Sequence, residues 1–139
     1  MCEFELKYPS GPYIHRGLRE AELELFLNVL DIKVRDVGTG WIWYRLPTFA
    51  DGEIGIGIGI ELGFNHGNLQ ELILFHDDPA IYGTGWSDWS ETKEKLRAES
   101  TLCWLQGRGF DTGQHYWGEV WSYYDAKSGF GSGGVRYSP

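Results

Sequence analysis

The sequence predicts an α+β fold in which a mostly antiparallel β-sheet carries two helices packed on one face. The 139 residues include 20 glycines and 16% aromatic residues, a composition that favours strands and turns over a helical bundle. Over residues 51–64, large apolar residues alternate with small or polar ones, which indicates a strand. Residues 17–31 and 90–106 have the apolar spacing or the capping residues of helices.

The first helix is expected over residues 17–31, followed by two strands. Four apolar residues have the i, i+3, i+4, i+7 spacing of one helical face: Leu23, Phe26, Leu27 and Leu30. Residues 32–37 and 41–47 alternate β-branched or aromatic residues with polar ones, and a Gly-Thr-Gly turn separates them. Pro47 is expected to end the second strand, because proline cannot donate a hydrogen bond to a sheet.

The stretch DGEIGIGIGIELGF, residues 51–64, is a phosphate-binding loop, a membrane segment or a strand with one bare face, and it is too short to span a bilayer. It lacks the Lys and Ser or Thr of a Walker loop and the G-x-G-x-x-G spacing of a dinucleotide site. Its period is two, which places large apolar side chains on one face: Ile54, Ile56, Ile58, Ile60, Leu62 and Phe64. The other face holds Glu61 and four glycines: Gly55, Gly57, Gly59 and Gly63. We therefore expect a strand.

This strand is expected to form an antiparallel hairpin with residues 69–76 through a four-residue loop. The register pairs Phe64 with Leu69, Ile60 with Ile73, and Ile58 with Phe75. The glycine face then receives Leu72, Leu74 and His76. Glycine weakens a strand unless something packs closely over it, so we expect aromatic rings of the protein to cover this face. A ligand or a partner backbone lying there is the alternative.

The second half of the chain is expected to form a helix and then two strands. Asp88 with Glu91, or Ser87 with Ser90, can cap a helix over residues 90–106, and Gly107 can end it. The later part of that segment could instead be a strand. Residues 115–124 and 133–138 have strand composition and are joined through a turn rich in Asp, Ser and Gly. Three tryptophans in these periodic segments are expected in the core: Trp104, Trp117 and Trp121.

Length, cysteine content and charge narrow the class of protein. Residues 1–139 fit a single domain that can bury a core without metals or disulfides. Cys2 and Cys103 make no disulfide framework, and no leader-like or membrane-spanning run is found, so we expect a cytoplasmic protein. The net charge of −8 argues against nucleic acid and anionic membranes as partners, because both are bound through Lys and Arg.

The charge distribution suggests a basic protein partner. Between Arg45 and Lys93 the chain has eight acidic residues and no Lys or Arg. This stretch is either a solvated surface that aids solubility or an electrostatic docking face. Two tryptophans flank Ser87 and Asp88 in a loop, as at binding hot spots, although tryptophan in a small domain is more often core. The candidate partner-binding residues are Asp77, Asp78, Asp88, Glu91, Trp86 and Trp89.

No catalytic or metal-binding motif is found. The histidines lack the spacing of a zinc site, and neither Cys103 nor any serine lies in a nucleophile motif. His76 before Asp77 and Asp78 could supply a base with an orienting carboxylate, but a solvated strand end is the simpler interpretation. We expect no enzyme activity and no cofactor. A small enzyme or ligand-binding domain with a pocket over the glycine face is the alternative.

The general plan of the chain resembles a known class of proteins. A short acidic chain with an early amphipathic helix, a central sheet and the late segment YWGEVWSYYDAKSGFGSGGVRY is similar to the small immunity proteins encoded beside bacterial contact-dependent, Rhs or type VI secretion toxins. The resemblance implies binding to one cognate toxin and blockage of its active site or substrate entry. Immunity proteins share no common functional residue, so the resemblance assigns no role to any position.

Overall fold

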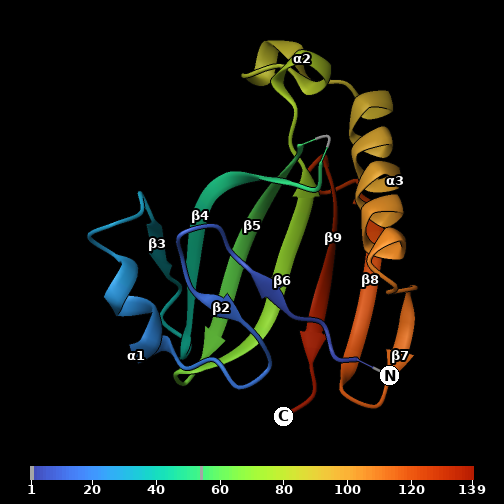
Figure 1. The fold of residues 1–139 in the computed structure, drawn as a ribbon. Coiled ribbons are helices and arrows are strands. Elements are labelled where there is room, and N and C mark those ends of the chain that lie inside the picture. Colours follow the sequence, from blue (N-terminus) through green and yellow to red (C-terminus); the bar gives the residue numbers. More distant parts are fainter. Residues whose placement is uncertain (1, 54) are drawn as a thin grey trace.

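The computed structural model describes residues 2–53 and 55–139, which form an α+β fold (Figure 1). The strands are β1 (Leu6–Lys7), β2 (Tyr13–Ile14), β3 (Lys33–Asp36), β4 (Trp41–Asp51), β5 (Ile56–Asn65), β6 (Asn68–His76), β7 (Gly113–His115), β8 (Gly118–Asp125) and β9 (Phe130–Tyr137). The helices are α1 (Glu20–Leu23), α2 (Pro79–Tyr82) and α3 (Glu91–Gly107), with the 3₁₀ turns η1 (Glu24–Phe26) and η2 (Trp86–Asp88).

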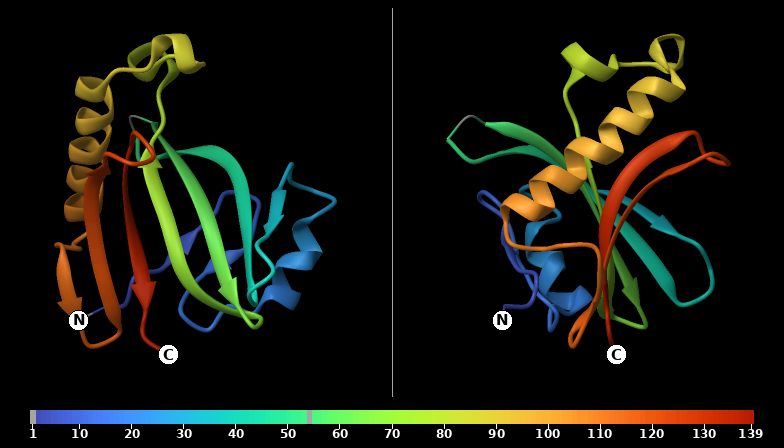
Figure 2. Two further views of the ribbon diagram at one scale, coloured as in Figure 1. Left: turned by 180° about the vertical axis from the view of Figure 1, so that it is seen from behind. Right: turned by 90° about the vertical axis from the view of Figure 1, so that its right-hand side faces the viewer.

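Within the described residues, the main sheet has seven antiparallel strands in the order β3-β4-β5-β6-β9-β8-β7. Helix α3 covers β6, β8 and β9 on one face, and the N-terminal segment with the small β1–β2 sheet covers the rest of that face (Figure 1). We call the opposite face the open face. No described segment packs across it (Figure 2, left).

The core lies between the sheet and this covering layer. Ile58, Ile60 and Leu62 of β5 are fully buried there, beside Phe4 and Leu105 from the layer above. The expected hairpin of residues 54–64 and 69–76 is confirmed in its antiparallel pairing and in the burial of Ile58 and Ile60. Ile54, which we expected on the same face, lies outside the described residues.

The expected register of this hairpin is wrong beyond its first pair. Phe64 does pair with Leu69, but the turn has two residues, His66 and Gly67, both with positive φ. The register then shifts at Gln70, so that Ile60 faces Leu74 and Ile58 faces His76. Since side chains alternate, one extra residue exchanges the two faces of β6. Leu72 and Leu74 therefore enter the core, while Ile73 and Phe75 take the glycine face.

Aromatic rings cover two of the four glycines for which we expected it, Gly59 and Gly63, whereas Gly57 faces the backbone carbonyl of Asp77 and no ring lies within 4 Å of a Cβ at Gly55. Each ring lies on the residue directly across from its glycine in the neighbouring strand: Trp43 over Gly63, Phe75 over Gly59, and Trp121 over Gly134. A Cβ added at Gly59 would lie 2.1 Å from Phe75 Cζ. The glycines thus let large rings lie flat on the sheet. Trp121 is therefore on the open face, and our expectation that it lies in the core is wrong.

Two other sequence expectations are corrected. The helix expected over residues 17–31 is reduced to α1 and η1. Within its expected apolar stripe, only Leu23 is fully buried, and Leu27 is 37% exposed at the margin of the sheet. Pro47 does not end its strand. The register shifts between Leu46 and Phe49, so proline occupies an irregularity where its missing N–H is tolerated, and β4 continues to Asp51.

The later elements follow the expectation closely. Helix α3 forms along its whole length, Ser90 caps it by accepting a hydrogen bond from Lys93 N, and Gly107 is its last residue. Trp104 and Trp117 are buried. The strand expected over residues 115–124 is instead divided into β7 and β8 by a turn at Tyr116 and Trp117. None of the described helices is long and apolar enough to cross a membrane.

Candidate functional site

A pocket of about 560 Å³ lies between the α2–η2 segment, the start of α3 and one end of the open face. Seven of its lining residues carry aromatic rings or cationic groups: Arg45, Phe75, Tyr82, Trp86, Trp89, Arg97 and Phe130. We call it the Trp86 pocket. It combines residues of β4, β6, α2, η2 and α3 with the β8–β9 turn, so tertiary folding alone assembles it.

Short-range hydrogen bonds shape the wall formed by α2 and η2. Asp78 caps α2 by accepting a hydrogen bond from Ala80 N at 3.0 Å, with Pro79 at the first helical position. Gly83, at φ 79°, ends this turn, and the Asp88 side chain packs against it. The Asp88 carboxylate accepts a hydrogen bond from Thr84 N at 3.2 Å. This aspartate therefore folds the loop back toward α3.

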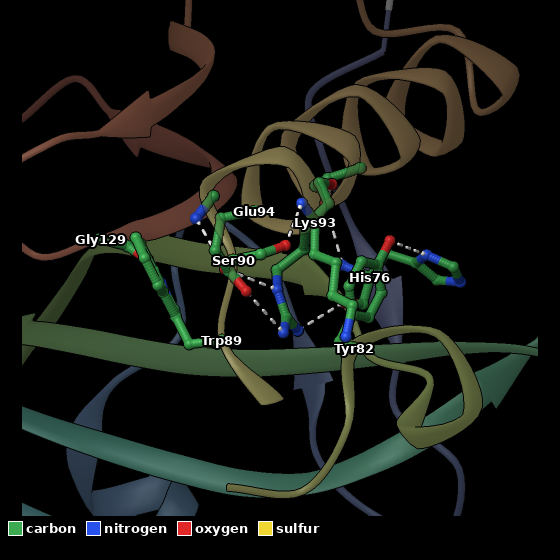
Figure 3. Close-up of polar contacts among 10 residues, drawn as sticks. His76, Tyr82, Trp89, Ser90, Lys93, Glu94 and Gly129 are labelled. Atoms are coloured by element: carbon green, nitrogen blue, oxygen red, sulfur yellow. Dashed lines mark hydrogen bonds and ion pairs between the residues drawn. The ribbon is translucent and has the colours of Figure 1, made fainter. Parts of the chain in front are cut away.

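The turn η2 is also fastened to the sheet and to α3. Trp89 Nε1 donates a hydrogen bond to Gly129 O in the β8–β9 turn at 2.7 Å (Figure 3). Lys93 Nζ donates to Asp88 O at 3.0 Å. Trp86, which precedes both attachments in the chain, is 84% exposed. A large ring is thus exposed to solvent beside the pocket, on a loop whose later residues are hydrogen-bonded to the β8–β9 turn and to α3.

A buried ion pair forms the floor of the pocket. Arg97 lies 3.0 Å from Glu94 Oε1, and both side chains are at most 10% exposed. Glu94 also accepts a hydrogen bond from Gly131 N, and Arg97 donates to His76 O at 2.9 Å (Figure 3). The guanidinium carbon of Arg97 lies 4.1 Å from the ring centroid of Tyr82. These contacts join α2, α3, β6 and β9 at one point.

His76 and Tyr82 lie beside this floor, with the His76 ring on the α3 side of the sheet. His76 Nδ1 and the Tyr82 hydroxyl are 2.8 Å apart (Figure 3). Burial raises the pKa of Tyr82 above its ordinary value, although a hydrogen bond with Ser100 and the charge of Arg97 oppose the rise. Tyr82 is therefore a neutral hydrogen-bonding group at neutral pH.

A second hollow, the sheet-face groove, continues from the Trp86 pocket along the open face and measures about 680 Å³. Arg45, Phe75, Ser128 and Phe130 line both hollows. On the far side of the groove, Arg136 lies 3.0 Å from Glu71 and 3.5 Å from Glu119. Its hydrogen bond to Glu71 raises the pKa of Arg136. The groove is thus a surface of rings and charges of both signs.

The structure brings the candidate partner-binding residues to one end of the molecule. Asp77, Trp86 and Trp89 line the Trp86 pocket, while Asp78, Asp88 and Glu91 lie in the surrounding turns and in the first turn of α3. We call this set of six the α2–η2 end; α2 stands at the top of Figure 1. Three of the acids have structural partners: Asp77 accepts a hydrogen bond from Thr48, and Asp78 and Asp88 hold backbone N–H groups.

The acidic stretch between Arg45 and Lys93 does not form one surface. Asp51 lies 3.4 Å from Arg108 on the α3 side of the sheet. Glu61 and Glu71 line the sheet-face groove beside arginines. Glu91 at the α2–η2 end forms only an exposed pair with Lys95, at 3.5 Å. The α2–η2 end therefore holds only part of the acidic stretch, and three of its four acids already accept hydrogen bonds from the protein.

The structure does not bring His76 and Asp78 together over the glycine face, as the alternative of an enzyme or ligand-binding site there would require. His76 faces α3 and lines a separate hollow of about 630 Å³ with Cys103, whereas Asp78 caps α2. Sequence reasoning also missed Arg45, Arg97 and Phe130 as lining residues, because no local pattern shows that β4, α3 and β9 meet. Among the described residues, no three His, Cys, Asp or Glu side chains are grouped to hold a metal ion.

Comparisons with family models, with curated proteins and with solved structures find no match for this chain.

Proposed function

We propose that this protein is a stoichiometric inhibitor of the immunity class, which binds a basic protein partner through the α2–η2 end and the Trp86 pocket. The observation that carries the proposal is Trp86, 84% exposed on a loop that is closed by the Thr84–Asp88 hydrogen bond and tied to the β8–β9 turn through Trp89. Exposed tryptophan has a cost in solubility and brings no packing energy to the free fold. Tryptophan beside a pocket is instead typical of a binding hot spot, where the partner buries the ring.

The surroundings of Trp86 support a protein partner over a small molecule. Asp88 and Glu91 lie in η2 and in the first turn of α3 next to the pocket, which shares four lining residues with the larger groove of the sheet face. Together the hollows offer a long, shallow, mixed-charge surface. Small-molecule sites are instead concave and mostly apolar, and they enclose most of the ligand surface. The two acids next to the pocket would attract a basic partner and speed association.

Coexpression with the product of the adjacent reading frame tests this proposal. We expect the two proteins to purify as a one-to-one complex in which the partner's activity is blocked. Trp86→Ala should weaken binding about 10- to 100-fold, mainly by faster dissociation, as loss of a hot-spot ring does. Leu25→Ala is the matched control, because Leu25 is 77% exposed on η1 and lies outside the α2–η2 end. No complex, or equal binding by Trp86→Ala, would refute the proposal.

A further inference from the structure

Arg45 stands where the Trp86 pocket and the sheet-face groove meet. Its guanidinium carbon lies 4.9 Å from the ring centroid of Phe75. Phe75 is 3% exposed and rests on Gly59, so the ring beneath Arg45 is fixed in place. A guanidinium stacked on a ring keeps the N–H donors at its edge available for a planar acceptor.

Arg45 is also the uncompensated charge of the Trp86 pocket. The other arginine of this pocket, Arg97, is paired with Glu94. Glu61 is directly across from Arg45 in the β4–β5 register, yet no carboxylate oxygen of the described residues lies within 4.0 Å of the Arg45 guanidinium. Asp77, which lines the same pocket, is engaged by Thr48. Arg45 is therefore the cationic group of this pocket that has no ion-pair partner among the described residues, although the whole molecule is acidic.

We propose that Arg45 receives a carboxylate side chain of the protein partner, held at the junction of the two hollows while Asp88 and Glu91 contact basic residues around it. This inference rests on the proposed function and specifies the partner surface. That surface is basic at its margin and presents one Asp or Glu at its centre. Arginine suits this role, since its paired donors match the two carboxylate oxygens and its stacked plane is already oriented.

A titration without the partner tests the site directly. Sodium glutarate is the probe, with sodium chloride at equal ionic strength as the reference, and ¹H–¹⁵N spectra follow the Arg45 Nε and the Trp86 and Trp89 indole signals. We expect saturable shifts at millimolar glutarate that Arg45→Met abolishes. Arg136→Gln, which alters an arginine already paired with two carboxylates, should leave them intact. Equal shifts in Arg45→Met would overturn the assignment of the site.

The complex with the partner tests the source of the carboxylate. Arg45→Met should weaken binding at least 10-fold, Arg45→Lys less, and Arg35→Met at the groove margin little. Neutralising each surface Asp and Glu of the partner in turn should reveal one whose effect disappears in Arg45→Met. A complex that depends on Trp86 but not on Arg45 refutes this inference alone. If neither residue matters, the proposed function fails as well.

Discussion

Single residues on the open face show how glycine and aromatic content together define a surface. Two glycines of the bare face predicted from the sequence, Gly63 and Gly59, lie under Trp43 and Phe75, and Gly134 of β9 lies under Trp121. The sequence predicts that rings cover them, because an uncovered glycine face would weaken the sheet. It does not predict which rings, because Phe75 reaches Gly59 only after the shift at Gln70. No residue type in this part of the sequence marks the position of that register shift.

Replacing a covered glycine tests this seating. In Gly59→Ala the new methyl would lie 2.1 Å from the Phe75 ring, and the ring must move off the sheet. We expect a loss of about 1–3 kcal/mol in the free energy of unfolding, as for overpacking in a core. Gly107→Ala is the control, because nothing lies within 4 Å of that position at the end of α3. It should be neutral or more stable by up to about 1 kcal/mol. Urea denaturation of both variants measures the difference.

Tyr137 gives the protein a pH limit on the alkaline side. Its hydroxyl donates to Phe4 O at 2.6 Å in the core, and burial raises its pKa above the ordinary value of about 10. Between pH 10 and the raised pKa, the unfolded chain has lost this proton while the folded chain keeps it. The ionisation of Tyr137 therefore leaves the free energy of unfolding unchanged below pH 10. Between pH 10 and the raised pKa it lowers the free energy of unfolding by about 1.4 kcal/mol per pH unit.

The variant Tyr137→Phe separates this titration from the hydrogen bond. We expect it to be less stable than the parent at pH 7, because Phe4 O loses its donor. Its unfolding free energy should fall less steeply between pH 10 and 11, because one titrating group has been removed. Chemical denaturation at several pH values measures both effects. Parallel pH profiles for the two proteins would contradict the assignment to Tyr137.

At the scale of elements, the sequence predicts best where a pattern is long and local. Helix α3 and the hairpin of β5 and β6 have many periodic residues and clear turn or capping signals, and both form. The prediction of a long early helix is wrong because apolar spacing does not show whether the sheet offers a surface on which the helix can pack. Leu25 and Leu27 of the predicted range are exposed at the margin of the sheet. The Trp86 pocket could be predicted only in part, since its two tryptophans and Asp77 are local but its arginines come from β4 and α3.

The Arg97–Glu94 pair determines how α3 meets α2 and the sheet. Arg97→Met would leave Glu94, 4% exposed, without its cation. We expect a loss of about 3–5 kcal/mol in unfolding free energy, as for other broken buried pairs. Lys95→Met, which breaks the exposed pair with Glu91, should cost less than about 1 kcal/mol. Thermal and urea unfolding measure both. Similar small losses in the two variants would show that the buried pair does not fasten α3.

At the scale of the whole molecule, charge is distributed unevenly. The protein carries a net charge of −8, yet the sheet-face groove contains arginines beside its glutamates, and the Trp86 pocket at the α2–η2 end contains Arg45, which forms no ion pair with the described residues. A partner with a basic margin would be attracted over a distance of about one Debye length, about 8 Å at physiological salt. Attraction of this kind acts on the rate of association, whereas Trp86 acts after contact through dissociation.

Charge reversal separates steering by the α2–η2 end from the effect of total charge. We expect Asp88→Lys combined with Glu91→Lys to slow association with the partner at least 10-fold at low salt. Asp88 also holds the loop through Thr84, so Glu91→Lys alone, with a smaller effect in the same direction, controls for loop disruption. Glu22→Lys with Glu24→Lys changes net charge equally on α1 and η1, which lie near the other end of the sheet (Figure 1), and should change the rate little. Stopped-flow mixing across a salt series measures the rates. If both pairs slow association equally, total charge and not the α2–η2 end governs the encounter; if neither does, the acidic stretch serves solubility alone.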